Sequence, residues 1–147
     1  MTVTENVVNL LLAAGLSGLI GLEREWRDRD AGLRTHMLVG LGAALFTIVG
    51  AELGTDPSRI AAQVVTGIGF LGAGAIFRSG ETIKGLTTAA GLWTVAGIGL
   101  AAGSGLVTLA VAATVIGLVI LFALLPLVER IAPKPPKEPR SDPDHTS

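Results

Sequence analysis

The ionisable residues of this chain are confined to short clusters, and the segments between the clusters are long and apolar. No Asp, Glu, Lys, Arg or His occurs from Asn6 to Leu22, from Met37 to Ala51, from Ile60 to Phe77 or from Leu86 to Val128. A helix needs about 20 mostly apolar residues, within a range of about 17–25, to cross a bilayer core. The pattern therefore predicts an integral membrane protein. Buried strands do not fit, because they span only about 4–8 residues between turn signals.

The run from Leu86 to Val128 is too long for one crossing, and it contains a Gly-Ser-Gly turn signal at residues 103–105. We therefore predict an all-α polytopic membrane protein, a compact bundle of five transmembrane helices within residues 1–130. The predicted helices lie at about 6–22, 37–53, 60–77, 86–102 and 106–128. No Lys or Arg precedes the first run, so we expect a transmembrane helix there and not a cleavable signal peptide.

The basic residues predict the orientation, because Lys and Arg accumulate on cytoplasmic loops. With five helices, ten of the 11 basic residues fall on one side, and only Arg59 falls on the other. We therefore expect the N-terminus outside and the C-terminus in the cytoplasm. Five of the seven prolines follow Ala132, with no aromatic or large aliphatic residue among them. This composition predicts that residues 131–147 form a disordered cytoplasmic tail.

Composition excludes several classes of protein. With no Cys, the chain has neither a disulfide framework nor Cys-ligated zinc or iron–sulfur sites. A net charge of −1 provides no basic field for nucleic acid. The lipid bilayer is the partner that a half-hydrophobic chain requires.

Small residues predict how the helices pack, since membrane helices associate through close approach of small side chains. The segment 60–77 is small on two sides and bulky on one, which favours a central position in the bundle. It includes a G-x-G-x-x-G pattern at residues 67–72, but the pattern lies within an apolar run and so indicates helix packing more than nucleotide binding. The candidate packing residues are Gly67, Gly69, Gly72, Gly74, Gln63 and Trp93.

Polar residues gather at the predicted cytoplasmic ends of the helices. We take the following as a candidate functional cluster: Glu23, Glu25, Asp30, Arg34, Thr35, His36, Arg78, Lys84, Thr87 and Thr88. Such a cluster suits an anion, a lipid headgroup or Mg²⁺, which prefers carboxylates and retained waters. The alternative is a solvated loop whose charges pair with one another. No spacing is diagnostic of a metal, and no nucleophile lies near His36 in sequence, so we expect no cofactor and no enzymatic activity.

Four ordered segments of this chain resemble the MgtC/SapB family. They are Gly-Leu-Ile-Gly-Leu-Glu-Arg-Glu at 18–25, Ala-Gly-Leu-Arg-Thr-His at 31–36, Gly-Ile-Gly-Phe-Leu-Gly-Ala-Gly at 67–74 and Lys-Gly-Leu-Thr-Thr-Ala-Ala-Gly-Leu-Trp at 84–93. The resemblance extends over roughly residues 5–128. It implies a bacterial inner-membrane protein with five helices and a cytoplasmic C-terminus, and it includes Glu23, Arg34, Thr35, His36, Gly69, Gly72, Gly74, Thr87, Thr88 and Trp93 among the matched positions.

The resemblance also implies a role in adaptation to magnesium limitation and related stress. The best-known members of the family are associated with virulence and act in part through membrane partners that include the proton-driven ATP synthase. Larger members carry a folded cytoplasmic domain after the fifth helix, so we expect a short member that lacks it. The first functional hypothesis is a non-enzymatic regulator or adaptor that binds other membrane proteins. The second is a small Mg²⁺ or other cation transporter or channel built by a homo-oligomer.

Overall fold

The computed structural model describes residues 2–79 and 82–131 of the chain. Within them the chain forms five α-helices and one short β-hairpin, so the prediction of a helical protein with five helices is confirmed. The elements are α1 (Val3–Trp26), α2 (Leu33–Glu52), α3 (Pro57–Gly74), β1 (Phe77–Ser79), β2 (Thr82–Lys84), α4 (Leu86–Gly103) and α5 (Val107–Ile131). The tail predicted over 131–147 lies, after Ile131, outside the described residues.

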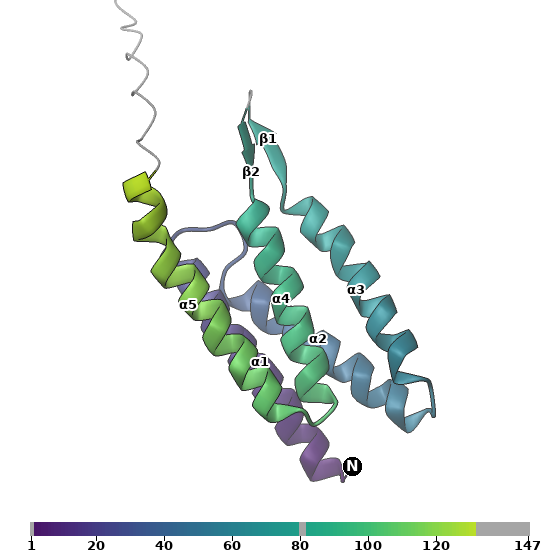
Figure 1. The fold of residues 1–147 in the computed structure, drawn as a ribbon. Helices are drawn as coiled ribbons and strands as arrows, with labels where there is room; N and C mark the ends of the chain where they lie inside the picture. Colours follow the sequence, from purple (N-terminus) through teal and green to yellow (C-terminus); the bar gives the residue numbers. More distant parts are fainter. Residues whose placement is uncertain (1, 80–81, 132–147) are drawn as a thin grey trace, which may run out of the picture.

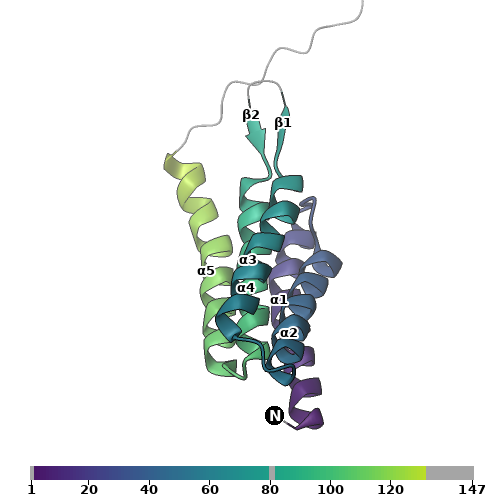
Figure 2. The ribbon, with the colours of Figure 1, turned by 90° about the vertical axis from the view of Figure 1, so that its right-hand side faces the viewer.

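Successive helices run in alternating directions along the bundle (Figure 1, Figure 2). The loop 27–32, the β-hairpin and the last turns of α5 lie at one end, which we call the hairpin end. The N-terminus and the connections 53–56 and 104–106 lie at the other, which we call the opposite end. The hairpin pairs Phe77 with Lys84 in an antiparallel register, where the sequence predicted only a loop.

Helix α4 is the centre of the bundle, since it packs against each of the other four helices. Figure 1 shows it between α3 and α5, in front of α1 and α2. Helix α3 lies at the edge and buries only Ile68 and Gly72, so the expectation that segment 60–77 is central is wrong. The reason is that most small residues of α3 face outward, whereas those of α4 face its neighbours.

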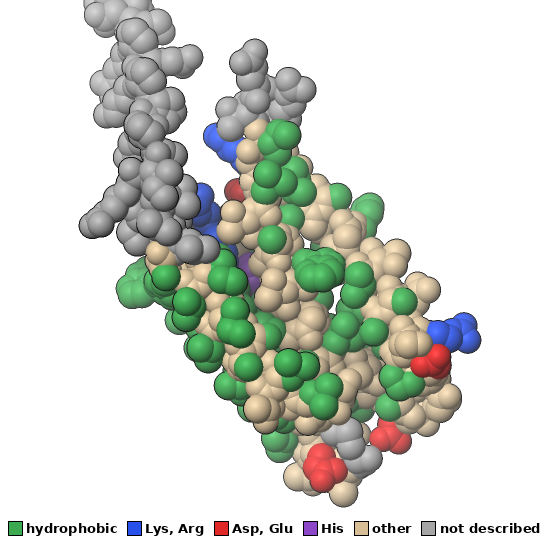
Figure 3. All heavy atoms as spheres, viewed as in Figure 1, with side chains coloured by type: hydrophobic (Ala, Val, Ile, Leu, Met, Phe, Trp, Pro, Cys, Tyr) green, Lys and Arg blue, Asp and Glu red, His purple; other side chains and the backbone are tan. Residues whose placement is uncertain are grey.

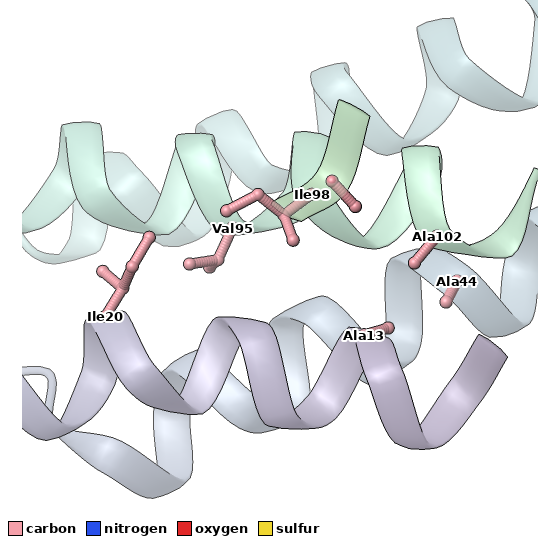
Figure 4. Close-up of a cluster of buried hydrophobic side chains, with 7 residues drawn as sticks. Ala13, Ile20, Ala44, Val95, Ile98 and Ala102 are labelled. Atoms are coloured by element: carbon pink, nitrogen blue, oxygen red, sulfur yellow. The ribbon is translucent and has the colours of Figure 1, made fainter. Parts of the chain in front are cut away.

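Glycine determines how closely α4 approaches α2. A Cβ atom on Gly99 would lie 2.3 Å from the Gly40 carbonyl oxygen, and one on Gly103 would lie 2.7 Å from the Ala44 carbonyl oxygen. Both helices therefore need these glycines for backbone-to-backbone contact, the packing mode that small residues permit between membrane helices. The adjoining core is made of small and β-branched side chains from α1, α2, α4 and α5, among them Ala13, Ala44 and Val95 (Figure 4).

Residues at the starts of α3 and α4 explain why these helices begin where they do. The Asp56 carboxylate accepts a hydrogen bond from the Ser58 backbone N–H, which holds the pKa of Asp56 below its ordinary value, and Pro57 begins α3. Gly85 joins the hairpin to α4 with a φ of +87°, and a Cβ there would lie 1.8 Å from the Ala75 carbonyl oxygen. Only glycine fits that conformation and that contact.

Three helices, α1, α2 and α4, are long and apolar enough to cross a membrane, and in α5 the shorter segment Val107–Ala123 is apolar. Large hydrophobic side chains such as Leu11, Phe46 and Phe70 are exposed on the flanks. Figure 3 shows that, on the face in view, the charged side chains lie toward the two ends of the bundle and the band between them is uncharged. These features are those of a membrane protein.

Candidate polar site at the hairpin end

An ion cluster is buried near the hairpin end of α1. Glu23 is 2% exposed and Arg24 is 3% exposed, and the Glu23 carboxylate accepts hydrogen bonds from both Arg24 and Arg27. Arg27, which is only partly buried, also lies over the ring of Phe122 in α5. Buried charges require partners of this kind, because unpaired charges are costly in an apolar interior. The cluster connects α1 to α5 through Arg27.

Arg24 was not among the residues singled out from the sequence. Its burial follows from the α1 face that packs inward, on which Asn9, Ala13 and Ser17 are also buried. Residue 24 falls on the same face, since residues four and seven positions apart share one side of a helix. This spacing is a sequence signal that could have identified Arg24 as an interior residue.

His36 is completely buried within the first turns of α2. Its Nδ1 lies 2.9 Å from the Gly32 carbonyl oxygen, an acceptor, so Nδ1 carries the proton and donates. Its Nε2 has no hydrogen-bond partner in the described part of the chain. The imidazole fits because its neighbours are glycines: a Cβ on Gly91 of α4 would lie 3.3 Å from Nε2, and one on Gly21 of α1 would lie 2.8 Å from the His36 Cβ.

Ser17 lies deeper along the same contact between α1 and α2. Its side chain is fully buried, and its Oγ has no hydrogen-bond partner among the described atoms. A Cβ on Gly40, one turn after His36, would lie 1.9 Å from that Oγ. Ser17 and His36 thus follow one another along the interface, but neither is reachable by a substrate from outside.

The remaining members of the predicted cluster divide between interior and surface. Glu25 accepts a hydrogen bond from the Leu33 backbone N–H at 3.0 Å and so caps the start of α2. Thr88 is buried in α4, one turn before Gly91. The side chains that point outward are those of Asp30, Arg34, Thr35, Lys84 and Thr87. Arg78 belongs to β1, and its side chain lies outside the described set.

The carboxylates at this end do not converge on a metal site. Glu23 accepts hydrogen bonds from two arginines, and Glu25 accepts one from the first backbone N–H of α2. Asp28 and Asp30 are exposed. Within residues 2–79 and 82–131 no three His, Asp or Glu side chains gather closely enough to hold an ion. The interior polar residues at this end are therefore Glu23, His36 and Thr88 of the predicted cluster together with Arg24, and the charges of Glu23 and Arg24 both act on His36.

A second feature is an apolar groove of about 730 Å³ between α2 and α3. Its lining includes Gly42, Phe46 and Gly67, and its polar side chains, Thr35, Thr55 and Gln63, are uncharged. Of the predicted packing residues in α3, Gly72 contacts Ala89 of α4, whereas Cβ atoms on Gly67, Gly69 and Gly74 would meet nothing within 4 Å. Trp93 is 57% exposed on α4. The predicted packing role of these outward-facing residues stays a prediction, and the contact would have to be with another molecule.

A model of the MgtC family matches residues 10–130 of this chain. The chain is 53% identical over 95 residues to the putative magnesium transporter YhiD of Escherichia coli K12, a match that covers 58% of this chain and 44% of that protein. It is 56% identical over 84 residues to protein MgtC of Salmonella typhimurium LT2, covering 56% of this chain and 36% of that protein. An uncharacterized protein of Synechocystis is 52% identical over 87 residues, with coverages of 58% and 37%.

The matched segment thus spans less than half the length of these relatives. No solved structure matches the chain. The family model nevertheless extends from the middle of α1 to the last turns of α5, and it includes every interior residue of the polar site. This chain therefore belongs to the MgtC family.

Proposed function

We propose that this protein is a multi-pass protein of the bacterial inner membrane, with five spans, its N-terminus outside and its C-terminus in the cytoplasm. The alternating helices support this orientation, because they bring Arg24, Arg27, Arg29, Arg34 and Lys84 to the hairpin end and leave Arg59 at the opposite end. Basic residues concentrate on the cytoplasmic side of bacterial membrane proteins. The hairpin end is accordingly the cytoplasmic end.

Within that membrane we propose a non-enzymatic regulator or adaptor that serves adaptation to magnesium limitation by binding other membrane proteins. The observation that carries the proposal is the groove between α2 and α3, which presents Gly42 and Gly67 to the outside with open space above them. A partner helix packs most closely where a membrane helix presents small residues. The groove is uncharged, as a surface for an apolar helix should be.

The second candidate is a small Mg²⁺ or other cation transporter formed by a homo-oligomer, a role suggested by the name of the Escherichia coli relative. The middle of the bundle favours the adaptor, because Ala13, Ala44, Val95 and Ala102 fill it without exposed surface. An ion path would therefore have to lie between copies of the chain. Ions also need oxygen ligands along their path, and the described carboxylates lie near the ends of the bundle.

Site-specific photo-crosslinking in native membranes tests the adaptor. A photoreactive residue at Gly67 faces the groove, and the matched control is Gly15 on α1; a Cβ atom at either position meets nothing within 4 Å. We expect a discrete heterologous adduct from position 67, stronger at low Mg²⁺, and none from position 15. Equal adducts from both positions, or an adduct at 67 that contains only copies of this chain, would contradict an adaptor that docks here.

Flux measurements test the transporter. The purified protein is reconstituted in liposomes, and the entry of Mg²⁺, protons and K⁺ is followed with trapped indicators under an imposed potential. The adaptor predicts rates equal to those of protein-free liposomes. Saturable Mg²⁺ entry that scales with protein content would favour the transporter instead.

A further inference from the structure

One ring nitrogen of His36, Nε2, has no hydrogen-bond partner in the described structure. Nδ1 donates to the Gly32 carbonyl of its own helix, so the ring orientation is held and Nε2 keeps a lone pair. That lone pair is buried, has no donor, and faces the α4 backbone at Gly91. A buried acceptor without a partner is uncommon in folded proteins and calls for a physical explanation.

The groups around His36 limit which ion or hydrogen-bond donor the Nε2 lone pair can accept. On α1 the charged groups that act on His36 are Glu23 and Arg24, and the Glu23 carboxylate is already shared between two arginines. On α2 the nearest ionisable neighbour in sequence is Arg34, which points outward. On α4 no ionisable residue occurs between Leu86 and Gly103, and the buried hydroxyl of this region is Thr88.

These surroundings disfavour Mg²⁺, which prefers oxygen ligands and retains water, and among the described residues no three His, Asp or Glu side chains gather to hold another metal ion. A proton needs only the lone pair. Once protonated at Nε2, however, the imidazolium presents an N–H toward α4 where the described structure has no acceptor, and it adds positive charge beside Arg24. A buried charge left in that state is costly unless the structure supplies a new partner.

We propose that His36 is a proton-binding site at the junction of α1, α2 and α4, and that proton uptake at Nε2 moves α4 away from α2. The movement starts at Gly91, which lies against the ring, and it admits water or releases Glu23 from one arginine to pair with the imidazolium. Because α4 is the central helix, its displacement changes the position of α3 and the β-hairpin as well. The proton comes from the hairpin end, near which His36 lies.

The absence of cysteine makes a direct test feasible. Spin labels on Gly42→Cys in α2 and Gly97→Cys in α4 report the separation of the two helices, and a Cβ atom at either position meets no other atom within 4 Å. In the same protein, His145→Gln leaves His36 as the single histidine for ¹⁵N-imidazole NMR. Both measurements are made on the full chain in lipid nanodiscs between about pH 8 and about pH 5, the range in which histidines commonly change charge.

We expect the NMR spectrum to show the Nδ1–H neutral ring at the upper pH and the doubly protonated ring at the lower pH. Over the same pH range the label distance should shift by about 1–2 Å or more, the usual scale of helix displacements in switching proteins. The control is His36→Asn, whose side-chain amide can donate to the Gly32 carbonyl in place of Nδ1 and cannot titrate. It should show no pH-dependent distance change, and His36→Gln provides a second non-titrating variant if Asn does not fold.

Three results would overturn the proposal. The ring stays neutral throughout, or it protonates while the label distance stays constant, or the non-titrating variant shows the same distance change as the parent. These readouts do not depend on any partner protein. The proton site can therefore fail while the adaptor stands, and the reverse is also true.

Discussion

At the residue scale, individual glycines, which have no side chain, determine how the central helix packs against its neighbours. Gly99 and Gly103 rest against the backbone of α2, and Gly91 leaves room for the His36 ring. On the same helix Gly97 faces open space. Glycines that look alike in the sequence therefore differ in function, because only those at helix contacts are required by the fold.

Gly99→Ala should destabilise the protein, because its new methyl group would lie 2.3 Å from the Gly40 carbonyl oxygen. We expect a loss of about 1–3 kcal/mol, the usual cost of overpacking, and a lower midpoint of thermal unfolding in detergent. Gly97→Ala is the matched control and should be neutral or slightly stabilising, since Ala is the better helix former. Equal midpoints for the two variants would contradict the α2–α4 contact.

Arg24→Leu should also destabilise the protein, because it removes one of two partners from a carboxylate that is 2% exposed. Breaking a buried ion pair from one side costs on the order of 3 kcal/mol. Arg29→Leu, at an exposed position of the loop 27–32 that follows α1, should change the unfolding midpoint little. If Arg29→Leu proved the more harmful variant, the charge cluster would not have the structural role assigned to it.

At the element scale, the helices themselves follow from the sequence, but their order in space does not. The charge-free runs predicted five helices, and five are observed because each run is apolar enough to require burial or lipid. The central position of α4 was missed, although Gly91, Val95, Gly99 and Gly103 repeat every fourth residue and form one buried ridge. The glycines of α3 indicated close helix packing equally strongly. The sequence alone does not distinguish glycines that face the bundle interior from glycines that face outward.

The edge position of α3 predicts different effects for two of its glycines. Gly72→Leu should lower the unfolding midpoint, because Gly72 is buried against Ala89 of α4. Gly69→Leu should leave the midpoint unchanged, because nothing lies within 4 Å of its Cβ position. Similar losses of stability in both variants would mean that α3 packs more centrally than described.

At the scale of the whole molecule, the candidate site was only partly predictable. Glu23, His36 and Thr88 were singled out and lie in the interior, whereas Arg34, Thr35 and Lys84 point outward. The burial of Arg24 and the unpartnered Nε2 depend on how α1, α2 and α4 come together, which is a tertiary property. The groove between α2 and α3 arises in the same way, from the position of α3 at the edge.

We propose above that five helices cross the membrane with the hairpin end in the cytoplasm. Single cysteines in this cysteine-free chain test it at four exposed positions: Asp30, Ser58, Lys84 and Ser104. With a membrane-impermeant thiol reagent on intact spheroplasts, we expect labelling of Ser58→Cys and Ser104→Cys, and labelling of Asp30→Cys and Lys84→Cys only after permeabilisation. Labelling of Lys84→Cys and Ser58→Cys from the same side would contradict it, because α3 would then not cross the membrane.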